Sequence, residues 1–280
     1  MINILHIQAN VTAALDEDIR NGDLTAQLIL EHTQAHATII TRQDAVLCGT
    51  PWFDECFKTL DASCSIDWLA HDGDFIKAGQ TLCQIEGQAR ALLTAERSAL
   101  NFLQLLSATT TLTRHYVDAV SGTHAKIMDT RKTLPGLRMA QKYAVKTGGG
   151  HNQRMGLFDG ILIKENHILA AGGIRPVLEQ AFGLAPKGAT IQIEVETLAQ
   201  LSEALDAGAK LILLDNFNLD DMRAAVTLNA GRAELEASGG VNLNTVRAIA
   251  QTGVDRISIG ALTKDVQAID LSMRFDARNG

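Results

Sequence analysis

The chain has 280 residues, of which 46% are hydrophobic, and its formal net charge is −7. This length supports one large domain or two medium domains around a substantial core. The acidic balance argues against general nucleic-acid binding, and the sequence contains no run of about 18 apolar residues, the length that a membrane-spanning helix needs.

The start of the chain and its cysteines indicate a cytoplasmic protein. The first residues have neither the basic start nor the long apolar run of a signal peptide. No cysteine belongs to a C-x-x-C pair or has a histidine at zinc-like spacing. We therefore expect buried, reduced thiols, as in the reducing cytosol. The cysteines are Cys48, Cys56, Cys64 and Cys83.

The first third of the chain mixes short helices and short strands. Helical patterns cover residues 10–18 and 51–60. Apolar β-like runs predict strands at 37–40, 45–48, 65–69 and 81–86.

One segment of this region suggests a second class of function. Residues 72–87, DGDFIKAGQTLCQIEG, resemble the hairpin of a biotinyl- or lipoyl-type carrier, which would use Lys77. Because this hairpin pattern is often only scaffold, the carrier is the less favoured alternative. The prosthetic group of a carrier would increase the intact mass of the protein.

The longest helical pattern covers residues 95–120, where apolar side chains recur at i, i+3, i+4 spacing. Glu96, near the predicted start, suits the helix dipole. Arg97, in the same turn, costs roughly a few tenths of a kcal/mol. Arg97 is therefore either placed for function or simply a solvated surface charge, and the sequence leaves both possibilities open.

From residue 125 onward, strand-like and helical segments alternate. This rhythm is typical of a (β/α) barrel, and Gly208, Gly231 and Gly253 lie where helix C-caps belong. Six strands rather than eight are predicted, so we expect an incomplete barrel. The predicted strands are 125–128, 161–163, 190–195, 211–214, 234–237 and 256–259, and the predicted helices are 135–146, 175–182, 197–207, 219–229 and 244–251.

Polar residues or glycines follow each predicted strand, at the ends that form the active face of a barrel. Each one alone is better explained as a cap or a surface charge, but six such ends at one rim indicate a site. The residues are Thr130–Lys132, Lys164, Glu194 with Glu196, Asp215–Asn216, Ser238–Gly240 and Gly260.

These residue types divide by chemistry. Glu194 and Asp215, on neighbouring strands, can share a hard cation such as Mg²⁺. Ser238–Gly240 and Gly260 offer unobstructed backbone N–H groups of the kind that hold phosphate. Four cations at element ends can bind carboxylates or phosphates: Arg131, Lys132, Arg154 and Lys164. Three further basic residues fit a solvated helix face equally well: Arg138, Lys142 and Lys146.

Nine segments spread over nearly the whole chain match one known family: NGDLT, AERSALNFLQLLSATTT, DTRKTLPGLR, KYAVKTGGG, RMGLFDGILIKENH, IEVET, LILLDN, EASGG and ISIGALT. Through them the chain resembles the nicotinate-nucleotide pyrophosphorylases, also called quinolinate phosphoribosyltransferases. This resemblance implies an α/β protein with an N-terminal α/β sandwich domain at 1–114 and an incomplete, about six-stranded α/β barrel at 115–280. The last residues could then pack back on the first domain.

The resemblance also implies a reaction. Phosphoribosyl pyrophosphate and quinolinate would give nicotinate mononucleotide, pyrophosphate and carbon dioxide, a step of NAD biosynthesis that needs Mg²⁺. The enzyme would be a homodimer or a larger homo-oligomer, with Arg97 reaching into the partner's site.

Site roles follow from the same resemblance. The residues that match the quinolinate-binding positions of the family are Arg97, Arg131, Arg154 and Lys164. Those that match its phosphoribosyl pyrophosphate and Mg²⁺ positions are Lys132, Glu194, Asp215, Ser238, Gly239, Gly240, Ser258, Ile259 and Gly260, with Thr130 beside them. Lys132, Lys164, Glu194 and Asp215 are the expected catalytic residues, and Glu194 and Asp215 the expected metal ligands, directly or through water.

One position departs from the family pattern. The family often has a histidine before the arginine of the glycine-rich loop, where this chain has Gln153, with His151 two places earlier. Glutamine cannot take the positive charge that histidine can take near neutral pH. We expect Gln153 to give quinolinate a neutral contact. Alternatively, Gln153 points away and His151 is a surface loop residue.

Two other enzymes remain as alternatives. A related phosphoribosyltransferase would act on another heteroaromatic acid, and a Schiff-base aldolase would use Lys164 as its nucleophile. Borohydride trapping with a carbonyl substrate would reveal the aldolase.

Overall fold

The computed structural model describes residues 3–276. The chain divides into two compact units. Unit 1 comprises Met1–Leu112, Leu134–Gly148 and Asp265–Gly280, and unit 2 comprises Thr113–Thr133 and Gly149–Lys264. Among the described residues, no helix combines the length and the apolar character that crossing a membrane requires.

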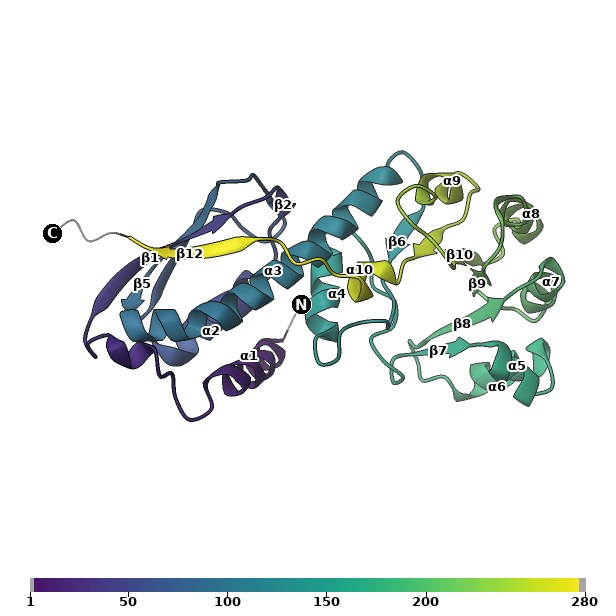
Figure 1. Ribbon diagram of the computed structural model, residues 1–280. Helices are drawn as coiled ribbons and strands as arrows, with labels where there is room; N and C mark the ends of the chain where they lie inside the picture. The colour runs from purple at the N-terminus through teal and green to yellow at the C-terminus, as the bar shows by residue number, and fades with distance from the viewer. Residues whose placement is uncertain (1–2, 277–280) are drawn as a thin grey trace. The chain divides into compact units, whose positions relative to one another are not determined.

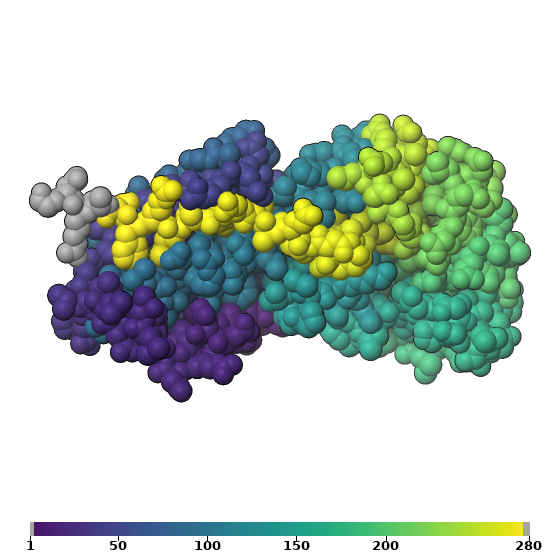
Figure 2. Space-filling view, in the orientation of Figure 1, coloured from purple at the N-terminus to yellow at the C-terminus, as the bar shows by residue number. Residues whose placement is uncertain are grey.

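Unit 1 is built on a four-stranded antiparallel sheet with the order β12-β1-β5-β3. Along β1 and β5 burial alternates from residue to residue, because one face of each strand packs on the core. Figure 2 shows the segment that contains β12, in yellow, at the surface. The strands are β1 (Gln34–Thr41), β3 (Ser65–Trp68), β5 (Thr81–Gln88) and β12 (Leu271–Phe275), with a separate pair of β2 (Ala45–Val46) and β4 (Phe75–Ile76).

Helices complete unit 1. They are α1 (Ile4–Ile19), the short 3₁₀ helix η1 (Ala26–Leu28), α2 (Thr50–Leu60), α3 (Ala89–Ala119), which continues into unit 2, and α4 (Arg138–Thr147). The Asp72 carboxylate caps α2 by accepting hydrogen bonds from the Gly49 and Thr50 N–H groups, both at 3.1 Å. Trp52, Phe53 and Phe57 of this helix are fully buried in the core of unit 1.

Two helices start earlier than predicted. Helix α1 begins at Ile4 because Asn3 caps it, accepting a hydrogen bond from Leu5 N–H (3.0 Å). Helix α3 begins at Ala89, directly after β5, rather than at residue 95. Arg97 therefore lies about two turns inside the helix. The prediction that it occupies a first turn is wrong, and the helix-dipole argument about it no longer applies.

The hairpin of the less favoured carrier alternative does not form. Strand β4 pairs with β2, whereas β5 lies in the middle of the other sheet between β1 and β3. Lys77 forms an ion pair with Asp44 (2.9 Å) at the surface. This segment is therefore part of the scaffold of unit 1.

Unit 2 holds six parallel strands in the order β6-β11-β10-β9-β8-β7, which confirms the six strands predicted for the incomplete barrel. They are β6 (Lys126–Met128), β7 (Gly160–Ile163), β8 (Thr190–Val195), β9 (Leu211–Asp215), β10 (Glu234–Ser238) and β11 (Arg256–Ser258). The helices are α5 (Glu165–Ala170), α6 (Ile174–Leu184), α7 (Leu198–Asp206), α8 (Leu219–Asn229), α9 (Val246–Ala250) and α10 (Ala261–Lys264). Figure 1 shows α6 to α9 along one side of these strands.

Two strands of unit 2, β8 and β10, alternate apolar and polar residues. On β10, Leu235 and Ala237 share one face, while Glu234, Glu236 and Ser238 share the other. On β8, Gln192 and Glu194 likewise alternate with buried Ile193 and Val195. The polar residues of β8 and β10 therefore share the inner face of this open barrel with Leu213 of β9.

A segment between β6 and β7, residues 151–154, contacts both edge strands of the sheet, and we call it the closing segment. His151 forms a parallel bridge with Met128 of β6. Arg154 donates from Nη1 to the carbonyl oxygen of Gly160, the first residue of β7 (2.9 Å). The closing segment thus occupies a place where a complete barrel has further strands.

Candidate functional site

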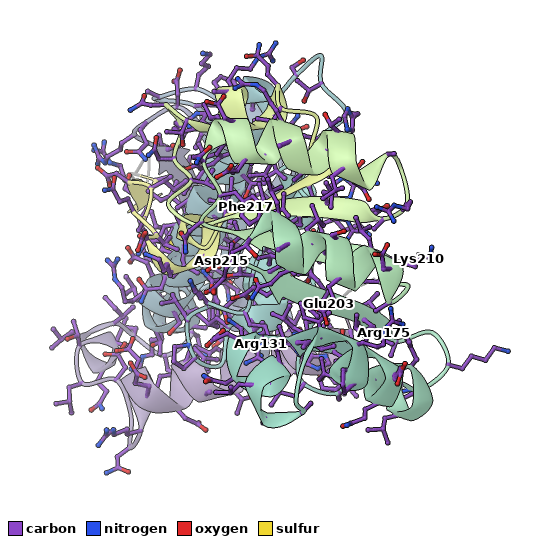
Figure 3. All side chains as sticks on the ribbon, turned by 90° about the vertical axis from the view of Figure 1, so that its right-hand side faces the viewer. Arg131, Arg175, Glu203, Lys210, Asp215 and Phe217 are labelled. Carbon is purple, nitrogen blue, oxygen red and sulfur yellow. The ribbon has the colours of Figure 1, made fainter. Side chains whose placement is uncertain are left out.

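The carboxyl ends of the unit 2 strands carry most of the predicted site residues. Asp215 and Ser238 are the last residues of β9 and β10, and Lys164 directly follows β7. In Figure 3, Asp215 and Arg131 lie on one side of the unit, and Lys210 and Arg175 on the opposite side. The strands run in parallel, so these ends form a single rim.

Lys164, Glu194 and Asp215 form the centre of this rim. The Lys164 ammonium is 3.4 Å from Glu194 Oε2, and only 11% of the Glu194 side chain is exposed. Burial raises the pKa of Glu194, the Lys164 charge opposes this rise, and the Asp215 charge adds to it. Two carboxylates whose charges repel each other are suited to a divalent cation.

Asn216 fixes Asp215 from the side. Its φ of 56° is left-handed, and its Nδ2 donates to Asp215 Oδ2 (2.9 Å). Its backbone N–H bonds to the Ser238 carbonyl oxygen (3.0 Å). The Asn216 side chain lies so close to Gly239 that a Cβ added there would be 2.1 Å from Asn216 Oδ1. Position 239 therefore requires glycine.

We expect Gly239→Ala to lower the thermal midpoint of unfolding clearly. The new methyl group would displace Asn216, and φ at this position is +103°, a strained value that costs about 1–3 kcal/mol. Gly240→Ala is the matched control, because φ there is +59° and, its two chain neighbours aside, no heavy atom lies within 4 Å of an added Cβ. It should cost about 1 kcal/mol. Equal losses in the two variants would contradict the role given to Asn216.

Strands β6 and β11 bring Thr130, Lys132 and Gly260 together. The Lys132 N–H bonds to Thr130 Oγ1 (3.1 Å), and the Thr263 hydroxyl donates to the Lys132 carbonyl oxygen (2.7 Å). A Cβ at Gly260 would lie 3.2 Å from the Lys132 side chain and 3.8 Å from Thr130 Oγ1. A cation, a hydroxyl and an open backbone thus meet, a combination suited to phosphate.

Arg131 and Arg154 form a second positive centre. Burial lowers the pKa of Arg154, and the nearby charge of Arg131 lowers it further, while Asp159 opposes both. Two guanidinium groups within electrostatic reach favour an anion with more than one negative charge.

Two further predicted residues lie outside these clusters. Arg97 is an exposed residue of α3 in unit 1. Gln153 is half-buried in the closing segment, where its Nε2 donates to Glu236 Oε1 and its backbone N–H to Asp129 Oδ1 (2.8 Å). The roles expected of both remain predictions.

Sequence reasoning missed Glu236 and Gln192. Glu236 is fully buried, and Gln192 Nε2 donates to its Oε2 (3.0 Å). The signal was present in the alternation of the strands ELEAS and TIQIEV, whose polar residues all fall on one face.

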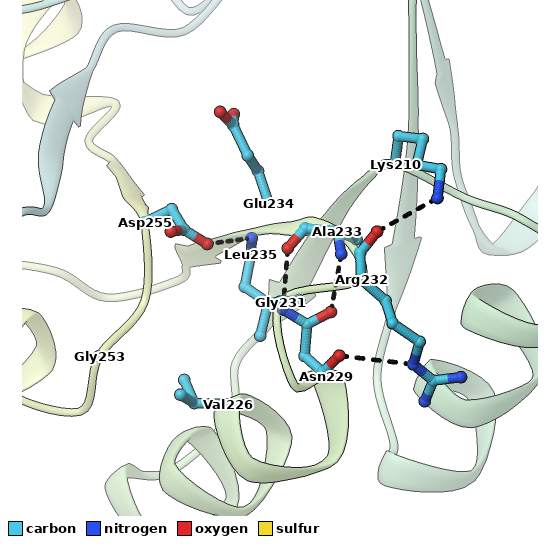
Figure 4. Close-up of a pocket in the computed structure, with 10 residues that line it drawn as sticks. All are labelled: Lys210, Val226, Asn229, Gly231, Arg232, Ala233, Glu234, Leu235, Gly253 and Asp255. Atoms are coloured by element: carbon cyan, nitrogen blue, oxygen red, sulfur yellow. Dashed lines mark hydrogen bonds between the residues drawn. The ribbon is translucent and has the colours of Figure 1, made fainter.

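A pocket of about 440 Å³ lies at the other ends of the strands (Figure 4). Its polar groups are engaged with one another. Lys210 Nζ donates to the Arg232 carbonyl oxygen (3.3 Å), and Asp255 Oδ2 accepts from Leu235 N–H (2.8 Å). This pocket is distinct from the rim and does not share its residues.

The chain matches two family models across most of its length. The model described as "Quinolinate phosphoribosyl transferase, N-terminal domain" matches residues 23–107, and the corresponding C-terminal domain model matches residues 109–274. The probable nicotinate-nucleotide pyrophosphorylase [carboxylating] of Bacillus subtilis is 42% identical over 263 residues, covering 94% of this chain and 91% of that protein.

Solved structures agree with these matches. The nicotinate-nucleotide pyrophosphorylase from Francisella tularensis has a TM-score of 0.95 and 43% identity, covering 99% of this chain and 98% of its own. NadC from Streptococcus pyogenes has a TM-score of 0.94 and 38% identity, covering 98% and 97%.

Proposed function

The chain belongs to the quinolinate phosphoribosyltransferase family, and from this membership we propose how its residues carry out the reaction. The protein is a pentosyltransferase of NAD biosynthesis. It joins quinolinate to the phosphoribosyl group of phosphoribosyl pyrophosphate and releases pyrophosphate and carbon dioxide. The main support for the residue roles is the cluster of Lys164, Glu194 and Asp215 at the strand ends.

Phosphoribosyl pyrophosphate is proposed to bind where the rim offers phosphate ligands and acids. Lys132, Gly260 and the Ser238–Gly240 turn would hold its phosphates. Glu194 and Asp215 would hold Mg²⁺, directly or through water, and the mutual repulsion of their charges is the observation that fits a cation there. When bound, Mg²⁺ neutralises the charge that develops on the leaving pyrophosphate.

Quinolinate is proposed to bind at the second positive centre. Arg131 and Arg154, together with Lys164, would bind its two carboxylates. The pyridine nitrogen then attacks C1 of the ribose, so the protein supplies orientation and electrostatics rather than a nucleophile. The resulting pyridinium withdraws electrons from the adjacent carboxylate, and carbon dioxide leaves without a further cofactor.

The comparisons do not favour the two alternative enzymes. An aldolase would use Lys164 as its amine nucleophile, whereas in the structure the Lys164 side chain is paired with Glu194 at 3.4 Å. Choosing among heteroaromatic acids requires one assay. Protein, Mg²⁺ and phosphoribosyl pyrophosphate are incubated with quinolinate or with nicotinate, and the products are identified by mass. Product from nicotinate alone would overturn the proposal.

We further propose that the protein works in the cytoplasm as a homodimer or larger homo-oligomer. Its four cysteines are buried free thiols, as suits a reducing compartment. Leu24, Leu28 and Leu30 are 81–82% exposed in the single chain, and exposed apolar surface of this kind is typical of an interface.

Arg97 is proposed to act in the site of the partner subunit, since it is exposed on α3. We expect Arg97→Ala and Lys164→Ala each to be inactive, and a mixture of the two to regain activity after subunit exchange. Mixed oligomers would then contain some sites in which both residues are intact. Exchange should be monitored by native mass spectrometry. Exchange without recovered activity would show that Arg97 acts within its own chain.

A further inference from the structure

Glu236 is a buried carboxylate to which the proposed mechanism gives no role. It lies on the inner face of β10 and is completely buried. An isolated charge is costly at such a position, so a buried carboxylate needs several hydrogen-bond donors. Glu236 has two amide donors, and they come from separate parts of unit 2.

The donors connect the sheet to the closing segment. Gln192 Nε2, from β8, donates to Glu236 Oε2 at 3.0 Å. Gln153 Nε2, from the closing segment, donates to Glu236 Oε1. Ser258, from β11, and the charge of Arg256 lie close enough to lower the pKa of the carboxyl group against the effect of burial. Two of these partners, Gln153 and Ser258, are predicted substrate-binding residues.

An ionised carboxylate only accepts hydrogen bonds, so it also fixes how its partners are oriented. The Gln153 amide must turn its Nε2 toward Glu236, which leaves its Oε1 facing elsewhere. The Gln153 backbone is held as well, since its N–H donates to Asp129 Oδ1 at 2.8 Å. The next residue, Arg154, is tied to the carbonyl oxygen of Gly160.

We propose that Glu236 is a positioning residue that, through Gln153, holds the closing segment so that Arg154 is presented to the carboxylates of quinolinate. This inference rests on the proposed function. According to this inference, a residue in the barrel interior affects substrate binding at the rim. A change in the Glu236 carboxylate would loosen the closing segment, which contacts both edge strands. The purely structural alternative is that Glu236 only fills the interior and balances the charge of Arg256.

The two alternatives differ in what Glu236→Gln does. Burial raises the pKa of Glu236, so the ionised group opposes folding at neutral pH. Replacing a buried charge by a neutral group of the same shape is often neutral or stabilising. We therefore expect the thermal midpoint to stay the same or rise. We also expect the KM for quinolinate to increase about fivefold to tenfold, the size of one hydrogen bond, with the KM for phosphoribosyl pyrophosphate changed much less.

A double-mutant cycle tests whether Gln153 carries the effect. Quinolinate KM, and Kd from calorimetry, are measured for wild type, Glu236→Gln, Gln153→Ala and the double variant. If Glu236 acts through Gln153, the Glu236→Gln effect disappears in the Gln153→Ala background. Additive effects, or an unchanged quinolinate KM in a Glu236→Gln protein that is as stable as wild type, would overturn the inference.

Glu234→Gln is the matched control. Glu234 lies two residues earlier on the same face of β10, where it pairs with Arg256. We expect the quinolinate KM of Glu234→Gln to stay within about twofold of the wild-type value. This change is smaller than the loss of one hydrogen bond would cause. An increase equal to that of Glu236→Gln would mean that the charge of Arg256, not Gln153, carries the effect, and would overturn the inference. A wild-type protein without activity on quinolinate would instead refute the proposed function.

Discussion

Lys164→Ala is expected to remove nearly all turnover while leaving the fold intact. Lys164 lies beside Glu194 at the centre of the rim, between the two proposed anion sites. Each charge-assisted contact to a substrate is worth about 1.5–3 kcal/mol. Losing two of them together should reduce kcat/KM by roughly a hundredfold or more.

The control must separate lost charge from lost structure. The Lys164 side chain is 48% exposed, so its removal should change stability little, and circular dichroism with thermal melting will check this. Lys210→Ala removes a lysine at the opposite end of β9 (Figure 3) and should keep kcat/KM near that of wild type. If Lys164→Ala also turns over nearly normally, the central role of Lys164 is wrong.

Glu194→Gln, like Asp215→Asn, should lose most Mg²⁺-dependent use of phosphoribosyl pyrophosphate. Both carboxylates are proposed around the metal, and neither is proposed to contact the pyridine ring. Calorimetry should show phosphoribosyl pyrophosphate with Mg²⁺ binding about tenfold or more weakly, as the loss of a charged contact predicts. Quinolinate binding should change less than about twofold.

The same Glu194→Gln variant should be more stable than wild type at neutral pH. In the wild-type protein, the pKa of the Glu194 carboxyl is raised by folding, chiefly through burial. As pH rises through the window above the unfolded pKa, the unfolded chain loses its proton first, so stability falls. The glutamine amide of the variant cannot ionise, so the variant does not lose stability in this way. Glu196→Gln, at an exposed neighbouring position, is the control and should alter neither property. An unchanged Mg²⁺ dependence in both Glu194→Gln and Asp215→Asn would count against the metal site.

Periodicity predicted the elements of unit 2 closely. Each of the six strands begins and ends within one residue of its predicted position. Short apolar runs bounded by charged residues fix both the type and the ends of a buried strand. The residues at the strand ends followed from the same pattern. A parallel sheet exposes all its carboxyl ends on one side, so Asp215 and Ser238 could be placed from the sequence alone.

Other features depend on contacts that local patterns do not contain. The start of α3 at Ala89 continues directly from β5, with no cap in the sequence to mark it. Helix α4 begins at Arg138, not 135, and belongs to unit 1 although it interrupts unit 2 in sequence. The bond from Gln153 to Glu236 joins positions far apart in the chain. Only the folded structure shows that this glutamine is held by a buried carboxylate.

The pairing of β12 with β1 has a consequence for synthesis on the ribosome. Leu271 pairs with Thr41, and Phe275 pairs with Ala37. All of unit 2 lies between these two strands in the sequence. The N-terminal sheet therefore emerges with one edge unpaired and keeps it so while the whole barrel is translated. An open edge is a template for pairing with another chain. Nascent chains would then be most prone to aggregate during this interval, which ends only when β12 leaves the exit tunnel.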